Sequence, residues 1–199
     1  MTKHLTITLG ILAILCLGCK FASLGGLSGG GDYSSASDKF SIAFPGGASG
    51  VENKSADDVK YATAAREYSK SFDNRSDNYR SYEVQVLEIP ASSVEGKENR
   101  EILEIGLNGW EDEPETVVKE TSVNGLKGID SVRSIEIGPA KMTFREVVFW
   151  SPKDKKLYVV KVAAVKKENV ATKEANDFVS SFKLTTQPEE VAKCQNLNL

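Results

Sequence analysis

The segment from residue 116 to 165 constrains the fold most, because its pattern is that of four β-strands joined by short turns. Asn124-Gly125 is the pair most typical of a two-residue hairpin turn. Gly138-Pro139 and the polar loop 151–155 break the pattern twice more. Strands joined this closely run antiparallel to each other. The expected strands are 116–123, 126–137, 141–150 and 156–165.

The last two of these strands are apolar at consecutive positions, at Val147–Trp150 and at Leu157–Val160. A strand with one face in water would alternate apolar and polar residues instead. We therefore expect both strands to be covered on both faces and to lie near the centre of the sheet. Gly128, in the second strand, is a possible β-bulge.

Shorter strands are expected before this segment. Residues 39–44 alternate apolar and polar side chains and stop at a Pro-Gly-Gly turn. Residues 82–86 also alternate, and Pro90 closes that strand. The polar stretch 48–60 is expected to be a loop. Residues 61–68 fit either a strand or a short helix, and we favour the strand.

Two segments change to the helical period, in which apolar residues recur every three or four positions. The first runs from residue 97 to 110, and Pro114 prevents its continuation. The second runs from residue 171 to 182. The apolar sets are Ile102, Leu103, Gly106, Leu107 and Trp110, and then Ala171, Ala175, Phe178 and Phe182. The sequence thus predicts an α+β fold, with an antiparallel sheet of about six to seven strands and helices packed against it.

Composition sets the size and class of the domain. Residues 38–184 form one expected domain, and a chain of about 150 residues buries roughly 70% of its unfolded surface. Charged residues are 27% and apolar residues 40% of the chain, and the net charge is −3. This balance does not favour nucleic-acid binding, which needs a strongly basic face. Residues 185–199 show no periodicity and are expected to be a tail.

The N-terminus has the order of an export signal. Lys3 precedes an apolar run, Leu5–Leu17, that is too short to span a bilayer as a helix, for which about 20 residues are needed. A charged start, a run of this length and small residues at its end are typical of a cleavable signal peptide, expected here over residues 1–18.

The end of this signal, Leu17-Gly18-Cys19, resembles a bacterial lipoprotein signal. The resemblance implies cleavage before Cys19 and lipidation of its thiol with acyl chains such as palmitate. Such signals usually have Leu three residues before the lipidated cysteine and a small residue two before it, where this chain has Cys16 and Leu17. The alternatives are an ordinary signal peptide cut nearby or an uncleaved anchor.

Residues 19–37 are expected to be a tether that follows the lipidated cysteine. The stretch 23–37 is rich in Gly and Ser and cannot bury enough apolar surface to offset its ordering entropy. The expected location is the cell envelope, with the membrane as a partner through the lipid. Cys194 is the remaining cysteine, so a disulfide framework is absent. If Cys19 is not lipidated, a Cys19–Cys194 bridge becomes possible.

Three local patterns together resemble the PsbP-like group of exported domains, which includes bacterial lipoproteins. They are Phe40–Pro45, the Leu157–Val160 run after a strand bearing Arg145, and Asn176–Leu184. The resemblance implies an antiparallel sheet with helices on both faces, an α/β/α sandwich. The group shares no single activity, and none of its ligand residues can be matched here. The stretch 51–78 departs most from the group.

Histidine is missing after the signal, since His4 is the one histidine of the chain. This excludes Ser-His-Asp triads, Cys-His pairs and His-ligated zinc from the mature chain. Residues 29–31 are Gly-rich but do not form a phosphate-binding loop, because no strand precedes them and no Gly-Lys-Ser/Thr follows.

Two residue sets remain as candidates for a site. The first is an acidic cluster, whose carboxylates suit Ca²⁺ or Mn²⁺, although such runs are usually solvated loops. It comprises Glu111, Asp112, Glu113 and Glu115. The second alternates aromatic and basic residues, a composition found at binding surfaces, although some of its tyrosines must belong to the core. It comprises Tyr61, Arg66, Arg75, Tyr79 and Arg80, with Tyr68 and Tyr82 between them.

These observations favour a membrane-anchored, exported lipoprotein whose domain is a non-enzymatic binding or assembly module for a protein or envelope component. The alternatives are a carboxylate-dependent hydrolase and a Ca²⁺- or Mn²⁺-binding module. No cofactor is expected, and no residue is assigned a catalytic or metal-binding role.

Overall fold

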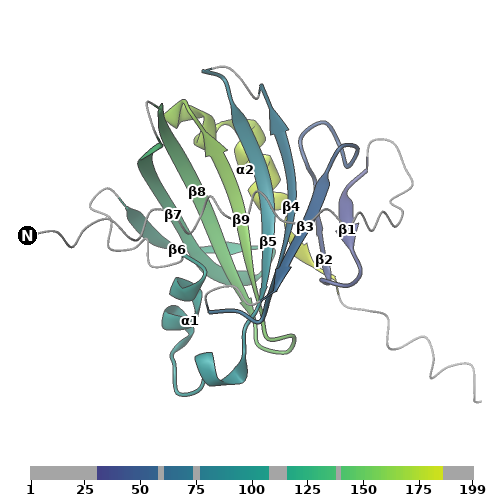
Figure 1. Cartoon of the computed structure of the whole chain (residues 1–199), viewed down its shortest axis with the longest axis vertical. Helices are drawn as coiled ribbons and strands as arrows, with labels where there is room; N and C mark the ends of the chain where they lie inside the picture. The colour runs from purple at the N-terminus through teal and green to yellow at the C-terminus, as the bar shows by residue number, and fades with distance from the viewer. Residues whose placement is uncertain (1–30, 58–60, 74–76, 108–115, 138–139, 186–199) are drawn as a thin grey trace, which may run out of the picture.

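The computed structural model describes residues 31–57, 61–73, 77–107, 116–137 and 140–185. Within them, seven strands form a large sheet in the order β3-β4-β5-β9-β8-β7-β6, and three form a small sheet in the order β1-β2-β10 (Figure 1). Neighbouring strands are antiparallel throughout. The α+β class and the sheet of about six to seven strands are confirmed, whereas the small sheet was not expected.

The elements have the following bounds. The large sheet comprises β3 Glu52–Asp57, β4 Ala64–Phe72, β5 Arg80–Glu88, β6 Val117–Val123, β7 Leu126–Ile137, β8 Ala140–Ser151 and β9 Lys156–Ala164. The small sheet comprises β1 Tyr33–Ser35, β2 Phe40–Ile42 and β10 Lys183–Leu184. The α-helices are α1 Asn99–Ile105 and α2 Lys173–Ser181, and the 3₁₀ helices are η2 Ala91–Ser93 and η4 Lys167–Ala171.

The Asn124-Gly125 turn forms as expected between β6 and β7, where Val123 pairs with Leu126. Both turn residues have positive φ, 49° and 82°, as a type I′ hairpin turn requires. The Asn124 side chain also donates hydrogen bonds to the carbonyl oxygens of Ser180 and Phe182, at 2.9 and 2.8 Å. This turn therefore also holds the end of α2.

Strands β8 and β9 are central, as their apolar runs predicted. The side chains of Val147 and Val148 point to opposite faces, and both are fully buried. In β9, Leu157 and Tyr158 show the same two-sided burial. A strand buried on both faces needs a covering layer on each side of the sheet.

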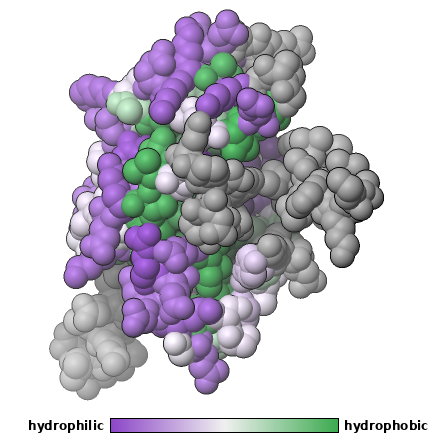
Figure 2. Space-filling view, turned by 90° about the vertical axis from the view of Figure 1, so that its left-hand side faces the viewer, coloured by the Kyte–Doolittle hydropathy of each residue, from purple (hydrophilic) through white to green (hydrophobic). Residues whose placement is uncertain are grey.

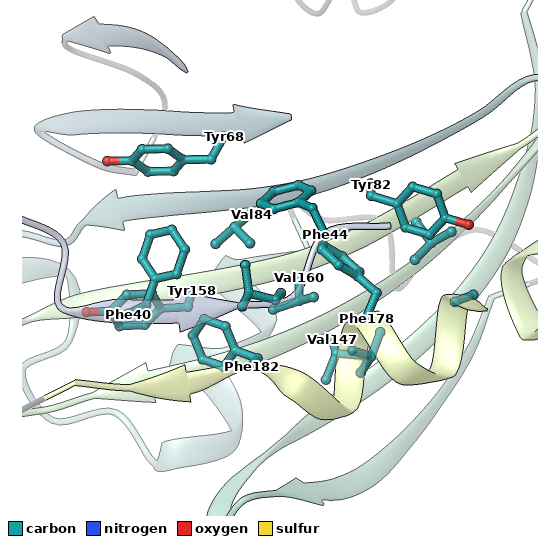
Figure 3. Close-up of a cluster of buried hydrophobic side chains, with 14 of the residues drawn as sticks. Phe40, Phe44, Tyr68, Tyr82, Val84, Val147, Tyr158, Val160, Phe178 and Phe182 are labelled. Carbon is teal, nitrogen blue, oxygen red and sulfur yellow. The ribbon is translucent and has the colours of Figure 1, made fainter. Parts of the chain in front are cut away.

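The first covering layer consists of α2 and the small sheet (Figure 3). Phe182, just after α2, stacks on Phe149 of β8, with ring centroids 5.2 Å apart and planes 4° apart. Phe178 of α2 contacts Tyr82 of β5 edge to face, at 5.2 Å. Phe40 of β2 packs against Phe182 at 6.0 Å, so the small sheet and the helix share one core.

The second covering layer is α1, on the opposite face of the sheet. Its buried Ile102 and Leu103 join Leu107 in a cluster with sheet residues that include Val148 and Val159. Both expected helices are therefore present, one on each face. No helix in the described part of the chain has the length and apolar character needed to cross a membrane.

The expectation of a loop over 48–60 is wrong, because residues 52–57 form β3 at one edge of the large sheet. Glu52 pairs with Ser69, and the register continues to the end of the strand. The side chains of residues 52–55 are exposed. Backbone pairing with β4 forms this strand, so no apolar alternation marks it in the sequence. The favoured strand over 61–68 is confirmed as β4, shifted to Ala64–Phe72.

The expected tether also extends too far. Residues 33–35 form β1, which pairs with β2. The ring of Tyr33 lies 5.4 Å from that of Tyr68 and 5.8 Å from that of Phe44. One aromatic residue in a Ser-rich stretch gives no periodic signal, but its contacts with the core order the strand.

The expectation of a bulge at Gly128 is wrong as well. Gly128 pairs with Thr121 on one side and with Phe149 on the other, in a regular register. A Cβ at this position would lie 2.2 Å from the carbonyl oxygen of Val148 and 2.8 Å from the Phe149 ring. The glycine permits close approach of the two strands, which is its other common role in a sheet.

We predict that Gly128→Ala lowers the free energy of unfolding by at least about 2 kcal/mol, because the added methyl must displace backbone of a buried strand. Urea unfolding of the variant measures the change. Thr121→Ala, at the partly exposed position opposite, is the matched control and should cost about 0.5 kcal/mol. Equal losses in the two variants would contradict the close-approach explanation.

Candidate functional site

A cleft lies between strands β6, β7 and β8 and the segment formed by η4 and α2. It consists of two adjoining hollows of about 270 and 390 Å³, which share Lys119, Asp130, Val132 and Lys167. We call it the Asp130 cleft. Its further lining residues are Val117, Arg133 and Ser134 in the first hollow, and Arg145, Glu168, Val170, Ala171 and Asn176 in the second.

A buried ion pair forms the polar centre of this cleft. Arg145 donates from Nε and Nη2 to the two carboxylate oxygens of Asp130, at 3.2 and 2.9 Å. Its Nη1 donates to Asn176 Oδ1 at 2.6 Å, and Asn176 donates to the Ala171 carbonyl oxygen at 3.1 Å. The Asp130 side chain is 4% exposed and that of Arg145 is 16% exposed. The guanidinium is thus fixed from both the sheet and α2.

Strand register explains why these residues meet. Asp130 pairs with Val147, and Arg145 pairs with Val132, so the two charged residues are diagonal neighbours on one face. Alternation along each strand sends both side chains to the face that α2 covers. The cleft therefore occupies a place where that covering layer meets the outer strands of the sheet.

The rim of the cleft is more exposed than its centre. Lys119 Nζ lies 3.9 Å from Asp130 Oδ2, and its side chain is 67% exposed. Lys167 and Glu168 are exposed as well. Val117 is 64% exposed and adds apolar surface. The side of the molecule that carries β6 and β7 shows hydrophobic surface between hydrophilic borders (Figure 2).

A second ionic cluster surrounds Asp38, in the turn between β1 and β2. Its fully buried carboxylate accepts hydrogen bonds from Arg66 Nε at 2.7 and 2.8 Å, from Lys156 Nζ at 2.8 Å and from the Tyr68 hydroxyl. The Tyr158 hydroxyl donates to the Asp38 carbonyl oxygen at 2.8 Å. These bonds tie the turn of the small sheet to β4 and β9 of the large one.

Burial by itself raises the pKa of Asp38, but the hydrogen bonds from Arg66, Lys156 and Tyr68 outweigh it and leave the pKa below its ordinary value. Burial, together with the bond to Asp38, raises the pKa of Tyr68 to about 12. Both groups stay in fixed charge states near neutral pH. Because Asp38 has no exposed surface, we interpret this cluster as a structural lock rather than a binding site.

A third group of charges lies on the face of the large sheet that α1 also covers. Glu83, Lys161 and Glu146 are neighbours across β5, β9 and β8, and Lys161 Nζ lies 2.7 Å from Glu83 Oε1. Burial lowers the pKa of Lys161, but Glu83 and Glu146 outweigh this and raise it. Arg133 donates to Glu146 at 3.2 and 3.4 Å. These charges neutralise one another within the sheet.

The aromatic and basic set from the sequence does not form one surface. Arg66 belongs to the Asp38 cluster, whereas Arg80, at the other end of the strand pair, binds Asp73 and Glu174. Arg66 pairs with Val86, six residues from Arg80, which corresponds to about 20 Å along the strand. Tyr68 and Tyr82 are buried in the core, Tyr79 is half-buried, and Tyr61 is 48% exposed. Arg75 lies outside the described residues. Partner binding by any of these residues stays a prediction.

The other sequence candidates, Cys19 and the acidic cluster of Glu111, Asp112, Glu113 and Glu115, lie outside the described residues. Within the described ranges, no group of three or more His, Cys, Asp or Glu side chains is placed to hold a metal ion. The metal-binding alternative therefore stays a prediction.

Sequence reasoning did not find the residues of the Asp130 cleft. The available signal was a charged residue at an inward position of a strand: Asp130 follows the buried Ile129, and Arg145 precedes the run that starts at Val147. Only the register shows that the two charges meet. As for the hydrolase alternative, both carboxylate oxygens of Asp130 already accept hydrogen bonds from Arg145.

No protein-family model matches the chain, and no curated protein sequence does. Among solved structures, it is similar to cyanobacterial PsbP (CyanoP) of Synechocystis sp. PCC 6803, with 14% identity and a TM-score of 0.48 over 81% of this chain and 98% of that one. A protein of Bacteroides thetaiotaomicron VPI-5482 has 10% identity and a TM-score of 0.48 over 79% of this chain. This chain spans about half of that protein's length, 49%.

LpqN of Mycobacterium tuberculosis, a protein involved in cell envelope biogenesis, has 11% identity and a TM-score of 0.43 over 74% of this chain and 83% of that one. Identities and scores this low determine neither the family nor the function of the chain. The α+β architecture rests on its own strands and helices, described above.

We predict that Asp38 makes the fold sensitive to acid. Because its pKa is lower in the folded state than the ordinary 3.8, its contribution is complete above that value and is lost as pH falls through the folded pKa. Urea unfolding of the wild type and of Asp38→Asn between neutral and acid pH measures this. The variant should be about 3 kcal/mol less stable at neutral pH, and the difference should shrink in acid.

Asp177→Asn is the matched control for this prediction. Asp177 pairs with Lys173 on the surface of α2, and its side chain is 61% exposed. The Asp177→Asn substitution should lower the free energy of unfolding by less than about 0.5 kcal/mol. A constant difference between wild type and Asp38→Asn across the acid range would contradict the assignment.

Proposed function

We propose that the chain is an exported, lipid-anchored binding module that holds a protein or cell-envelope component close to a membrane, with the Asp130 cleft as its binding site. The observation that carries the proposal is the cleft itself, an open hollow with a fixed guanidinium at its centre. Pockets that combine apolar walls with a few fixed polar groups are the usual form of a binding site.

The anchor is supported by the order of residues at the N-terminus. A basic start, a short apolar run and Gly18-Cys19 together favour export and lipidation of Cys19. Tyr33, the first residue of β1, follows Cys19 by 14 residues. Even fully extended, 14 residues reach about 50 Å, so the domain would stay near the membrane that holds the lipid.

A binding role fits the chemistry of the cleft better than catalysis does. The buried carboxylate is engaged by Arg145, and the chain after the signal has no histidine to transfer protons near neutral pH. The polar groups at the centre are fixed by β7, β8 and α2. Such a fixed set of polar groups is suited to holding a ligand in one orientation.

We predict that Cys19→Ser abolishes lipidation. Intact mass of the chain purified from the membrane fraction should show a lipidated N-terminal cysteine in the wild type, and the variant should lack that added mass and leave the membrane. Cys16→Ser is the matched control, because it changes a cysteine within the signal and should leave the mature mass unchanged. A Cys19→Ser chain that stays membrane-bound, with a mass that differs from the wild type only by the exchange of sulfur for oxygen, would overturn the anchor.

We also predict that partner capture depends on the cleft. Cross-linking in intact cells should give a discrete adduct whose yield falls several-fold in the Lys119→Gln/Lys167→Gln variant. Lys173→Gln is the control, since it removes an exposed positive charge from α2 outside the cleft. An adduct of equal yield in all variants would rule out the cleft as the binding site.

A further inference from the structure

We propose that the Asp130 cleft binds a ligand carboxylate that carries a small apolar group, held by Arg145 with Lys119 and Lys167. The inference rests on the proposed binding role of the cleft and names the chemistry of its ligand. Three features support it, namely the hydrogen-bond donors of Arg145, the charges that a ligand would meet, and the apolar wall.

Arg145 has hydrogen-bond donors to spare. A guanidinium has five N–H donors, and the hydrogen bonds to Asp130 and Asn176 use one each on Nε, Nη1 and Nη2. In the part of the chain that the structure describes, two N–H groups of Arg145 therefore have no protein acceptor. Arg145 lines the larger hollow, so a ligand bound there would lie beside the guanidinium. Because Asp130 and Asn176 already hold the guanidinium, binding costs little side-chain entropy.

The accessible charge of the cleft favours an anion. The negative charge of Asp130 is buried and neutralised by Arg145, with 4% of its side chain exposed. Lys119 and Lys167 are exposed at the rim, and the opposing carboxylate there is Glu168. A ligand anion would thus meet one fixed guanidinium and two mobile ammonium groups. Charge-assisted hydrogen bonds of this kind are about twice as strong as neutral ones.

The apolar part of the wall indicates what kind of group the anion is attached to. Val132, Val170 and Ala171 line the larger hollow and offer no charged group. Its volume of about 390 Å³ lies at the small end of ligand sites. A carboxylate on a small aliphatic group fits both facts. The end of a short peptide and a free aliphatic acid share this chemistry.

Isothermal titration calorimetry on the full chain in detergent tests the proposal with three probes. N-acetyl-Ala-Ala with a free carboxylate represents a peptide end, its C-terminal amide removes the charge, and isovalerate represents a free acid. We expect at least one acid to bind, and the amide to bind at least about tenfold more weakly than the matching peptide acid. Tighter binding of the peptide acid or of isovalerate identifies the source.

Variants locate the binding. Lys119→Gln/Lys167→Gln should weaken the better acid about three- to tenfold, and Lys173→Gln should leave it unchanged. Arg145→Lys keeps the charge beside Asp130 but removes the spare planar donors, so it should weaken binding about tenfold. Near-UV circular dichroism establishes that each variant is folded. If Arg145→Lys does not fold, the Lys119→Gln/Lys167→Gln variant still decides the test.

Two results would overturn the proposal: no binding of either acid, or acid binding that the Lys119→Gln/Lys167→Gln variant leaves unchanged. These failures are distinct from failure of the proposed function. If cross-linking still depends on the cleft while neither acid binds, the cleft is the binding site and the carboxylate assignment is wrong. If an acid binds and cross-linking does not depend on the cleft, the ligand assignment stands and the envelope-partner role is wrong.

Discussion

Strands β8 and β9 are buried on both faces. The layer of α2 and the small sheet packs against one face, and α1 packs against the other. The stacked rings of Phe149 and Phe182 join the sheet to the end of α2, and Phe40 extends the same core into the small sheet. On the other face, α1 approaches β8 closely at Gly106, where an added Cβ would lie 2.6 Å from a Val148 methyl. Removing either layer would expose buried apolar side chains of these strands to water, such as Val147 on one face and Val148 on the other.

Several charged residues of this sheet are buried. Whether such a cluster is enclosed or borders an open hollow distinguishes a structural role from a candidate site. Asp38 is completely enclosed by its partners, and the charges around Lys161 compensate one another. Asp130 is also buried and paired, but its partner Arg145 borders an open hollow. The difference arises from position, because the hollow beside Arg145 lies where β6, β7 and β8 meet η4 and α2.

Much of the fold could be predicted because local patterns and tertiary contacts agree there. The hairpin at Asn124-Gly125, the central strands and the two helices all follow from turn chemistry and periodicity. The failures have one physical cause. β3, β1 and the pairing at Gly128 depend on backbone bonds to a neighbouring strand or on single contacts such as that of the Tyr33 ring with Tyr68, and these leave no periodic trace in the sequence.

The sequence by itself determined the class of the domain, because apolar periodicity dictates which faces of strands and helices must be buried. It also led us to expect an export signal that contains His4, the one histidine of the given sequence, and that has Cys19 as its lipidated residue. Only the tertiary structure decided which charges meet. Asp130 and Arg145 are 15 residues apart in the chain, and strand register makes them neighbours. It also separated Arg66 from Arg80, because antiparallel pairing places them about 20 Å apart at opposite ends of the β4–β5 pair.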